Sequence, residues 1–248
     1  MTPEKDPQWL SKKAIPARER LIFALDVPGP EQARRLVDTL GDAISFYKMG
    51  LELFMAGGYF ELLSDLLERG KKVFVDLKFF DVPQTVAAAV ARLRDRGATF
   101  ATVHGNDAML EAACREKGSL QILAVTVLTS LDQGDLRDLG FSVSPEKLVL
   151  SRAKRALALG CDGVISSGME VKALRESLGD RLLVVSPGIR PVENRPADDQ
   201  KRVVTPRDAF LNGCDYIVVG RPIRDAADPR VAAEAIQSSI ADLFRTQS

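Results

Sequence analysis

Short β-rich runs alternate with helix-forming stretches along almost the whole 248-residue chain. The runs recur at intervals of about 20 to 35 residues, and most of the stretches between them carry the apolar repeat of an amphipathic helix. Strands that alternate with helices form parallel sheets. Eight units in this length favour a closed (β/α)8 barrel, the TIM barrel of the α/β class, over an open doubly wound sheet. The predicted strands cover residues 21–26, 44–50, 72–78, 99–105, 121–128, 162–167, 182–187 and 215–220.

Proline and glycine mark the boundaries of several predicted helices. Proline fits the first turn of a helix, and glycine commonly follows the last turn. No segment has the composition of a linker, so we expect a single domain over residues 1–248, with residues 1–20 preceding the barrel as a short arm. The expected starts are Pro30, Pro83, Pro145 and Pro206, and the expected ends are Gly41, Gly70, Gly97, Gly160 and Gly213.

Charge and residue usage argue against several classes of function. The 34 basic and 34 acidic residues cancel, so no overall field draws the chain to nucleic acid or to an anionic membrane. Three cysteines without a CxxC pair favour a reducing cytoplasm over a disulfide framework. His104 is the single histidine, which excludes a multi-histidine metal site. No run reaches the roughly 18 apolar residues of a membrane span. With the balanced charge, this means that neither a membrane nor a nucleic acid is an expected partner.

Charged side chains stand where the second and third predicted strands end. Asp76 and Lys78 are two residues apart and should point to the same side of their strand, Lys48 ends the neighbouring strand, and Asp81 follows on the turn. Barrel active sites lie at these carboxyl ends. A structural Lys–Asp salt bridge, with Asp81 as a helix cap, is the alternative for these residues. Paired buried charge seldom serves stability alone, so the array favours a reaction centre.

Glycine and arginine follow the last two predicted strands. Barrels commonly bind phosphate in these loops, because glycine lets backbone N–H groups approach an anion and arginine clamps it. Gly220 and Arg221 suit these roles, and Arg190 or Arg195 would close from residues 188–203. That segment is rich in proline and charge and lacks periodicity, so we expect a lid there. Together these features predict a phosphorylated ligand.

The stretch "DLKFFDVPQTV", residues 76–86, resembles the D-x-K-x-x-D-I-P-x-T signature of the orotidine 5′-phosphate decarboxylase family, with Val82 in the isoleucine position. The resemblance continues in order through "FALD", "FYKMGLELF", "VTVLTS", "VSPGIRP" and "IVVGRPI", and only the amino-terminal arm lies outside it. It implies a TIM barrel that converts orotidine 5′-phosphate to UMP, the last step of pyrimidine nucleotide synthesis. It also implies that no cofactor and no metal take part.

The resemblance assigns roles to individual residues. The implied catalytic array is Lys48, Asp76, Lys78 and Asp81, in which Lys78 stabilises and protonates a carbanion at C6 of the pyrimidine. A homodimer is implied as well, since Asp81 and Thr85 would reach the neighbouring subunit's site. For His104 the resemblance offers no catalytic role, and packing in the core or at the rim is expected. The implied substrate ligands are Asp26 and Lys48 at the ribose, Asp76 beside the departing carboxylate, Thr85 at the ribose across the dimer, Thr129 or Ser130 at the pyrimidine, and Arg190, Gln200, Gly220 and Arg221 at the phosphate.

Two alternatives stay open at this point. One is a related Mg²⁺-dependent decarboxylase of a phosphorylated keto-sugar acid, whose similar motif holds the metal. In that branch a glutamate ligand is expected on the second strand, where this chain has Lys48, whose positive charge would repel the metal. The other is a barrel that binds nucleotides without catalysis. Activity that survives EDTA, and loss of orotidine absorbance, would separate the three.

Overall fold

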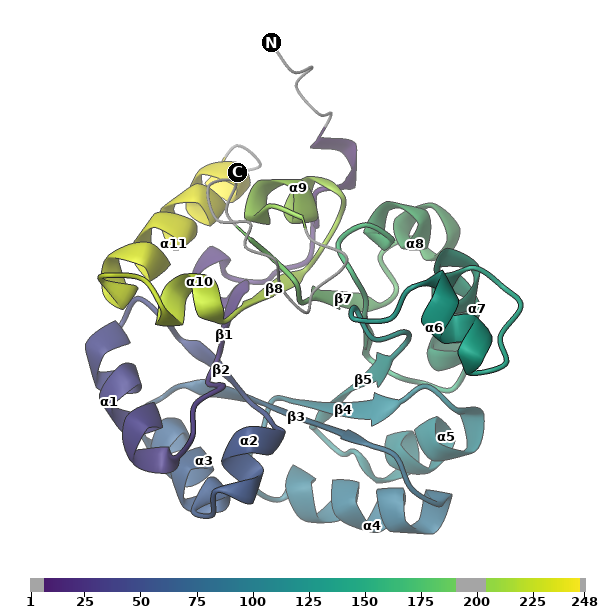
Figure 1. The fold of residues 1–248 in the computed structure, drawn as a ribbon, viewed down its shortest axis with the longest axis horizontal. Helices are drawn as coiled ribbons and strands as arrows, with labels where there is room; N and C mark the ends of the chain where they lie inside the picture. The colour runs from purple at the N-terminus through teal and green to yellow at the C-terminus, as the bar shows by residue number, and fades with distance from the viewer. Residues whose placement is uncertain (1–6, 191–203, 246–248) are drawn as a thin grey trace.

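Eight parallel strands close into a barrel in the computed structural model, which describes residues 7–190 and 204–245 (Figure 1). Each strand pairs with its neighbour in sequence, and β8 pairs with β1 to complete the ring. The predicted (β/α)8 barrel is confirmed: seven strands lie within their predicted ranges, and β3 extends one residue further. The strands are β1 Leu21–Ala24, β2 Phe46–Met49, β3 Lys72–Phe79, β4 Phe100–His104, β5 Gln121–Val125, β6 Gly163–Ile165, β7 Leu183–Ser186 and β8 Tyr216–Val219.

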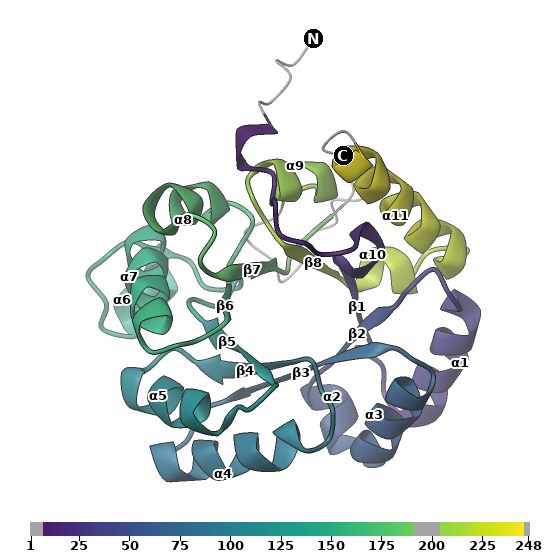
Figure 2. The same ribbon diagram turned by 180° about the vertical axis from the view of Figure 1, so that it is seen from behind.

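Helices surround the ring of strands on all sides (Figures 1 and 2). The four predicted starts are confirmed, since α1, α4, α7 and α9 each begin at the expected proline. None of the helices described is long and apolar enough to span a bilayer. The α-helices are α1 Pro30–Leu40, α2 Leu51–Met55, α3 Tyr59–Glu68, α4 Pro83–Arg94, α5 Asp107–Glu116, α6 Gln133–Asp138, α7 Pro145–Ala158, α8 Val171–Leu178, α9 Pro206–Leu211, α10 Arg221–Arg224 and α11 Pro229–Arg245; two 3-10 turns are η1 Pro7–Trp9 and η2 Ala17–Glu19.

An apolar layer fills the inside of the barrel and forms the floor below the site. The rings of Phe46, Phe74, Phe100 and Tyr216 contact one another, with centroids 5.1 to 5.9 Å apart. Because side chains alternate along a strand, the next inward positions after the three phenylalanines are two residues further on. Those positions hold polar side chains, so the apolar floor excludes water from one side of them.

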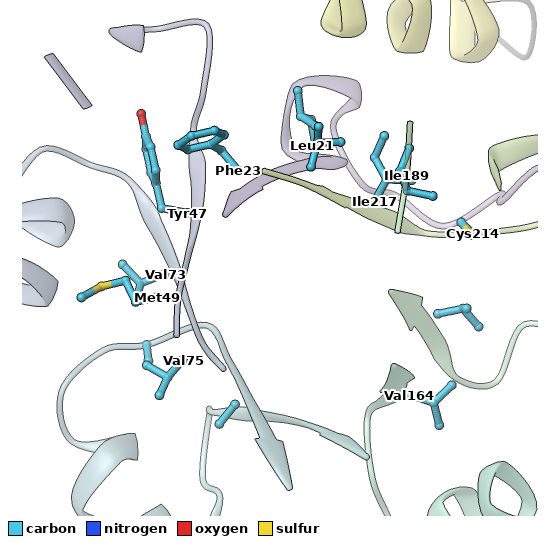
Figure 3. Packing of buried hydrophobic residues seen from close by; sticks show 14 of the residues in the cluster. Leu21, Phe23, Tyr47, Met49, Val73, Val75, Val164, Ile189, Cys214 and Ile217 are labelled. Atoms are coloured by element: carbon cyan, nitrogen blue, oxygen red, sulfur yellow. The ribbon is translucent and has the colours of Figure 1, made fainter. Parts of the chain in front are cut away.

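A second apolar layer lies between the strands and the helices. Figure 3 shows Tyr47 and Met49 of β2 and Val73 and Val75 of β3 on the outer side of their strands. All four side chains are at most 1% exposed. This outer layer fixes the strand register, since a slip of one residue would turn these side chains into the barrel.

Residues 7–20 run across the end of the barrel opposite the site, from beside α9 over β8 to α11 (Figure 2). The carbonyl of Arg20 accepts a hydrogen bond from the Ile217 N–H at 2.9 Å. The Arg20 guanidinium stacks on the ring of Phe244, 3.9 Å from its centroid. The segment before β1 is therefore anchored to the amino-terminal end of the barrel.

Candidate functional site

A cavity of about 570 Å³ opens at the carboxyl ends of the strands. Barrel enzymes place their active sites at this end. The cavity has both charged and apolar residues in its lining. Its charged lining consists of Asp26, Lys48, Asp76, Lys78, Arg190, Arg221 and Arg224, and its apolar lining includes Ala24, Val125, Val127, Leu128, Ile165, Ile189 and Val218.

Four charged side chains of alternating sign form a chain along one wall of the cavity. Lys48 Nζ donates to Asp26 Oδ1 at 3.0 Å and lies 3.5 Å from Asp76 Oδ2. Lys78 Nζ donates to Asp76 Oδ1 at 2.9 Å. The Lys48 and Asp76 side chains are each 12% exposed, whereas Lys78 is 34% exposed. The structure therefore brings three of the four predicted catalytic side chains together, with Lys78 more open than its partners.

The surroundings of Lys48 and Asp76 keep both groups ionised. Burial works against the charged form of Lys48, but attraction to Asp76 and Asp26 outweighs it and raises the pKa of the amine. Burial likewise opposes the charge on Asp76, but Lys48, Lys78 and a hydrogen bond from Thr102 hold the pKa of the carboxyl below its usual range. Within the described part of the chain, no three His, Cys, Asp or Glu side chains are grouped to hold a metal ion.

A bulge in β3 delivers Lys78 to this array. Val75 pairs with Ala101 and Phe79 with Val103, so four residue steps on β3 face two steps on β4. Lys78 has φ 47°, the one positive φ found at a non-glycine residue in the described chain. The same-side prediction for Asp76 and Lys78 is confirmed, but simple strand alternation is not the cause.

Thr102 of β4 is a member of the site that the sequence reasoning missed. Its Oγ1 donates to Asp76 Oδ1 at 2.9 Å and accepts a hydrogen bond from the Lys78 N–H at 2.9 Å. A signal was available: Thr102 follows Phe100 by two residues, as Asp76 follows Phe74 on the neighbouring strand. Matching inward positions across neighbouring strands would have indicated it.

Asp81 and Thr85 lie outside the cavity of their own chain. Both side chains are exposed, and neither lines the cavity. The N-cap of α4 is Val82, without a side-chain capping bond, so the alternative in which Asp81 caps this helix is wrong. Instead Asp81 Oδ1 accepts a hydrogen bond from the Val82 N–H at 2.6 Å.

The arginine-rich end of the cavity lies after β7 and β8. Gly220, Arg221 and Arg190 all line it. A Cβ on Gly220 would lie 3.3 Å from the Ala24 Cβ, so glycine keeps this wall close to β1. Arg224, which the sequence reasoning did not name, also lines the cavity and donates through Nη1 to the Asp26 carbonyl at 2.6 Å. Gln200, Arg195 and most of the expected lid, residues 191–203, lie outside the described residues.

The remaining predicted residues divide between the cavity and its surroundings. Thr129 and Ser130 line the cavity after β5. His104 does not line it; its ring packs 4.6 Å from the ring of Phe80, centroid to centroid. Burial, followed by the charges of Arg152 and Lys78, lowers the pKa of His104, so the ring stays neutral at neutral pH. This position agrees with packing at the rim.

Comparisons with known proteins agree with this geometry. The model of the family described as "Orotidine 5'-phosphate decarboxylase / HUMPS family" matches residues 19–236. A protein of Methylococcus capsulatus named orotidine 5′-phosphate decarboxylase is 68% identical over 238 residues, which cover 96% of this chain and 98% of the relative. A protein of the same name from Stenotrophomonas maltophilia is 50% identical over 94% of this chain and 98% of its own length.

Solved structures show the same relationship in three dimensions. The orotidine 5′-phosphate decarboxylase of Lactobacillus acidophilus superposes with a TM-score of 0.80 at 38% identity, over 90% of this chain and 99% of that chain. The enzyme of the same name from Pyrococcus horikoshii gives a TM-score of 0.71 at 26% identity, over 89% and 98% of the two chains. The array at the strand ends, the matching family model and these relatives converge: the chain belongs to the orotidine 5′-phosphate decarboxylase / HUMPS family.

Proposed function

We propose that this chain decarboxylates orotidine 5′-phosphate to UMP, the last step of de novo pyrimidine nucleotide synthesis. The observation that carries the proposal is the alternating chain Asp26, Lys48, Asp76 and Lys78 on the wall of a cavity whose other lining includes three arginines. Relatives that carry this activity in their names cover nearly the whole chain.

The chemistry explains why the site is built from charges. When CO2 leaves C6, the electrons of the broken carbon–carbon bond remain on C6 as a pair that cannot delocalise into the ring. Fixed charges must therefore stabilise the carbanion. In our scheme the Lys78 ammonium stabilises this pair and then gives C6 a proton, while Asp76 repels the carboxylate of the bound substrate. The 34% exposure of Lys78 supports its assignment as the group that meets the substrate.

Binding groups are assigned from their places around the cavity. Asp26 and Lys48, hydrogen-bonded to each other at 3.0 Å, would bind the ribose hydroxyls. Thr129 and Ser130 would bind the pyrimidine, since both follow β5 and line the cavity. No metal is required in this scheme, because Lys48 Nζ lies between the carboxylates of Asp26 and Asp76, where a cation ligated by both would sit.

The phosphate is assigned to the arginine-rich end. Arg221 and Arg190 carry positive charge into the cavity, and Gly220 allows close approach of the backbone. Gln200 is included from the family resemblance. Binding energy at the phosphate, remote from C6, can be used to organise the charged array in the transition state.

We further propose a homodimer in which Asp81 and Thr85 complete the partner's site. Both residues are exposed, and neither lines the cavity of its own chain. Five large apolar side chains are also exposed at the same end of the barrel, after β2 and β3, and exposed apolar surface can mark a protein–protein interface. They are Leu51 (57% exposed), Phe54 (41%), Met55 (79%), Phe80 (62%) and Val82 (61%).

Subunit mixing tests the shared site. Lys78→Ala and Asp81→Ala chains are each expected to be inactive as homodimers. In a mixed dimer one site has both Lys78 and Asp81 intact, so random reassociation should restore activity to about a quarter of the sites. No recovery from two folded, exchanging variants would contradict the shared site.

We also propose that the protein acts in the cytoplasm. The three cysteines, which are free thiols in the structure, support this location. Cell fractionation tests it.

We propose as well that the chain unfolds as one domain. Residues 7–20 form hydrogen bonds with the amino-terminal end of the barrel, which supports a single unit. Coincident unfolding transitions by fluorescence and circular dichroism test it.

The decisive experiment follows the ultraviolet absorbance of orotidine 5′-phosphate with purified protein after exhaustive EDTA treatment. Conversion to UMP is expected without added metal. Failure to convert it, with activity on a phosphorylated keto-sugar acid that returns with Mg²⁺, would overturn the proposal. Binding of UMP without any turnover would overturn it in favour of a non-catalytic barrel.

A further inference from the structure

Thr102 occupies a fully buried position beneath the charged array. Its side chain is 0% exposed, and it is absent from the cavity lining, so a substrate in the cavity would not contact it. Any effect of Thr102 on the reaction must therefore pass through the groups that it holds.

One hydroxyl bonds two parts of the site at once. A threonine hydroxyl has a single proton to donate and lone pairs that can accept. Thr102 Oγ1 donates a hydrogen bond to Asp76 Oδ1 and accepts one from the Lys78 N–H, both at 2.9 Å. The same Asp76 oxygen accepts from Lys78 Nζ at 2.9 Å. The three bonds form a closed loop through Thr102, the backbone and side chain of Lys78, and Asp76.

The bulge explains why the Lys78 backbone needs this partner. Between Val75 and Phe79 the regular pairing of β3 with β4 is interrupted. Lys78 has φ 47°, a conformation that residues other than glycine rarely adopt and that persists only where surrounding contacts hold it. Within the bulge, its N–H bonds the Thr102 hydroxyl in place of a strand carbonyl.

We infer that Thr102 is a positioning residue for the decarboxylation: its hydroxyl fixes both the left-handed backbone of Lys78 and the rotation of the Asp76 carboxylate, and so aims the ammonium at the reacting carbon. This inference rests on the proposed function. Without the hydroxyl, the Lys78 backbone loses its partner and Asp76 keeps only its lysine contacts, so the ammonium is less well placed while the cavity lining is unchanged.

The test compares Thr102→Val, which has the same shape without the hydroxyl, with Thr102→Ser, which keeps the oxygen. Misplacement of a catalytic group by about 1 Å can cost about 10²-fold in rate, so we expect Thr102→Val to lower kcat by up to about 10²-fold. KM and the affinity for UMP should change much less. Thr102→Ser should recover most of kcat. Should Thr102→Val fail to fold, Thr102→Cys keeps the volume, weakens both bonds and carries the same expectation.

Thr126 offers a matched control. It is also 0% exposed, and its Oγ1 donates only to a backbone carbonyl, that of Ile165, at 2.7 Å. Thr126→Val should lower the melting temperature as Thr102→Val does but leave kcat unchanged. A fall in kcat that is equal in the two variants would show a merely structural effect and overturn the inference, as would a folded Thr102→Val enzyme with normal kcat.

A second measurement is independent of activity. Hydrogen exchange at the Lys78 amide should speed up in Thr102→Val and stay slow in Thr102→Ser and Thr126→Val. Unchanged protection in Thr102→Val would overturn the inference even if kcat had fallen. Absence of decarboxylation by the wild-type protein would instead overturn the proposed function, while the exchange result would still decide whether Thr102 holds Lys78.

Discussion

The two ends of the barrel each hold a largely buried aspartate among basic side chains, and the two clusters differ in how their carboxylates are satisfied. At the carboxyl ends of the strands, Asp76 is bonded by Lys78 and Thr102 and lies 3.5 Å from Lys48. At the amino ends, Asp215 directly precedes β8 and is 0% exposed. Residue types alone would not tell these clusters apart.

Asp215 is surrounded by fixed donors. It accepts hydrogen bonds from Ser11 Oγ at 2.5 Å, Lys13 Nζ at 3.1 Å, Arg175 Nη2 at 2.7 Å and the Val184 N–H at 2.9 Å. Arg175 also donates to the carbonyls of Gly213 and Leu182, each at 2.9 Å, and its side chain is 6% exposed. Each charge in this cluster is engaged by the protein itself.

The site cluster instead leaves two of its charged groups open. Lys78 is 34% exposed and Asp26 is 47% exposed, and both face the cavity. A carboxylate with a complete set of donors serves the fold, whereas an ammonium held on one side and open on the other can act on a ligand. Access to one member, rather than burial of charge, therefore distinguishes a reaction centre.

The substitution Lys78→Ala, which removes the open ammonium of the site cluster, has the largest expected effect. We expect kcat/KM for orotidine 5′-phosphate to fall by about 10³-fold or more, since loss of a single preorganised donor already costs about 10²–10³. The free energy of unfolding should change little, because Lys78 is only partly buried. Ultraviolet assays and urea unfolding measure the two quantities. Near-normal turnover in a folded variant would remove Lys78 from the mechanism.

Asp215→Ala is the mirror experiment at the other end. Removing one partner of a buried charge cluster costs about 3–5 kcal/mol, and here it leaves Arg175 and Lys13 without their carboxylate. The midpoint in urea should fall sharply, while kcat of the folded fraction stays near wild type. A loss of stability below about 1 kcal/mol, the scale of an exposed pair, would contradict the structural role.

The barrel and most of the site could be predicted because their signals are local. Prolines mark the starts of four helices. Lys48 and Asp76 each follow an inward phenylalanine of their own strand by two residues, which places both on the inner side of the barrel. Periodicity within each run was enough to count eight strands. These features depend on neighbours in the chain, which a sequence shows directly.

What escaped prediction depends on contacts between distant segments. Ser11 and Asp215 are 204 residues apart, and nothing in either neighbourhood indicates the other. Thr102 lies in the stretch "TFATVHG", where threonine is an ordinary strand residue, and its only signal is an inward position that matches that of Asp76 on the neighbouring strand. The bulge that turns Lys78 toward Thr102 depends on the register of β3 against β4, which only the folded barrel defines.

Ser11→Ala should cause a smaller loss of stability at the amino-terminal end of the barrel. The hydroxyl donates to the charged Asp215, and a hydrogen bond to a charged group contributes about 1.5–3 kcal/mol. Ser11 lies outside residues 19–236, the part that matches the family model, so its effect reports on the arm. We expect urea unfolding to show a loss near the lower end of that range with unchanged kcat. An unaltered midpoint would mean that the arm does not stabilise the barrel through Asp215.

Acid unfolding of Asp76→Asn tests the smallest expected effect. The folded pKa of Asp76 lies below its usual value of about 3.9, because attraction to Lys48 and Lys78 outweighs burial. A carboxyl with a depressed folded pKa contributes stability above its unfolded pKa, and that contribution is lost as the pH falls through the folded pKa. The free energy of unfolding of the wild type should therefore decline below about pH 4, more steeply than that of Asp76→Asn. Parallel declines in urea titrations at pH 7, 4 and 3 would show that the site charges do not stabilise Asp76, and the contrast between the two ends of the barrel would then rest on access alone.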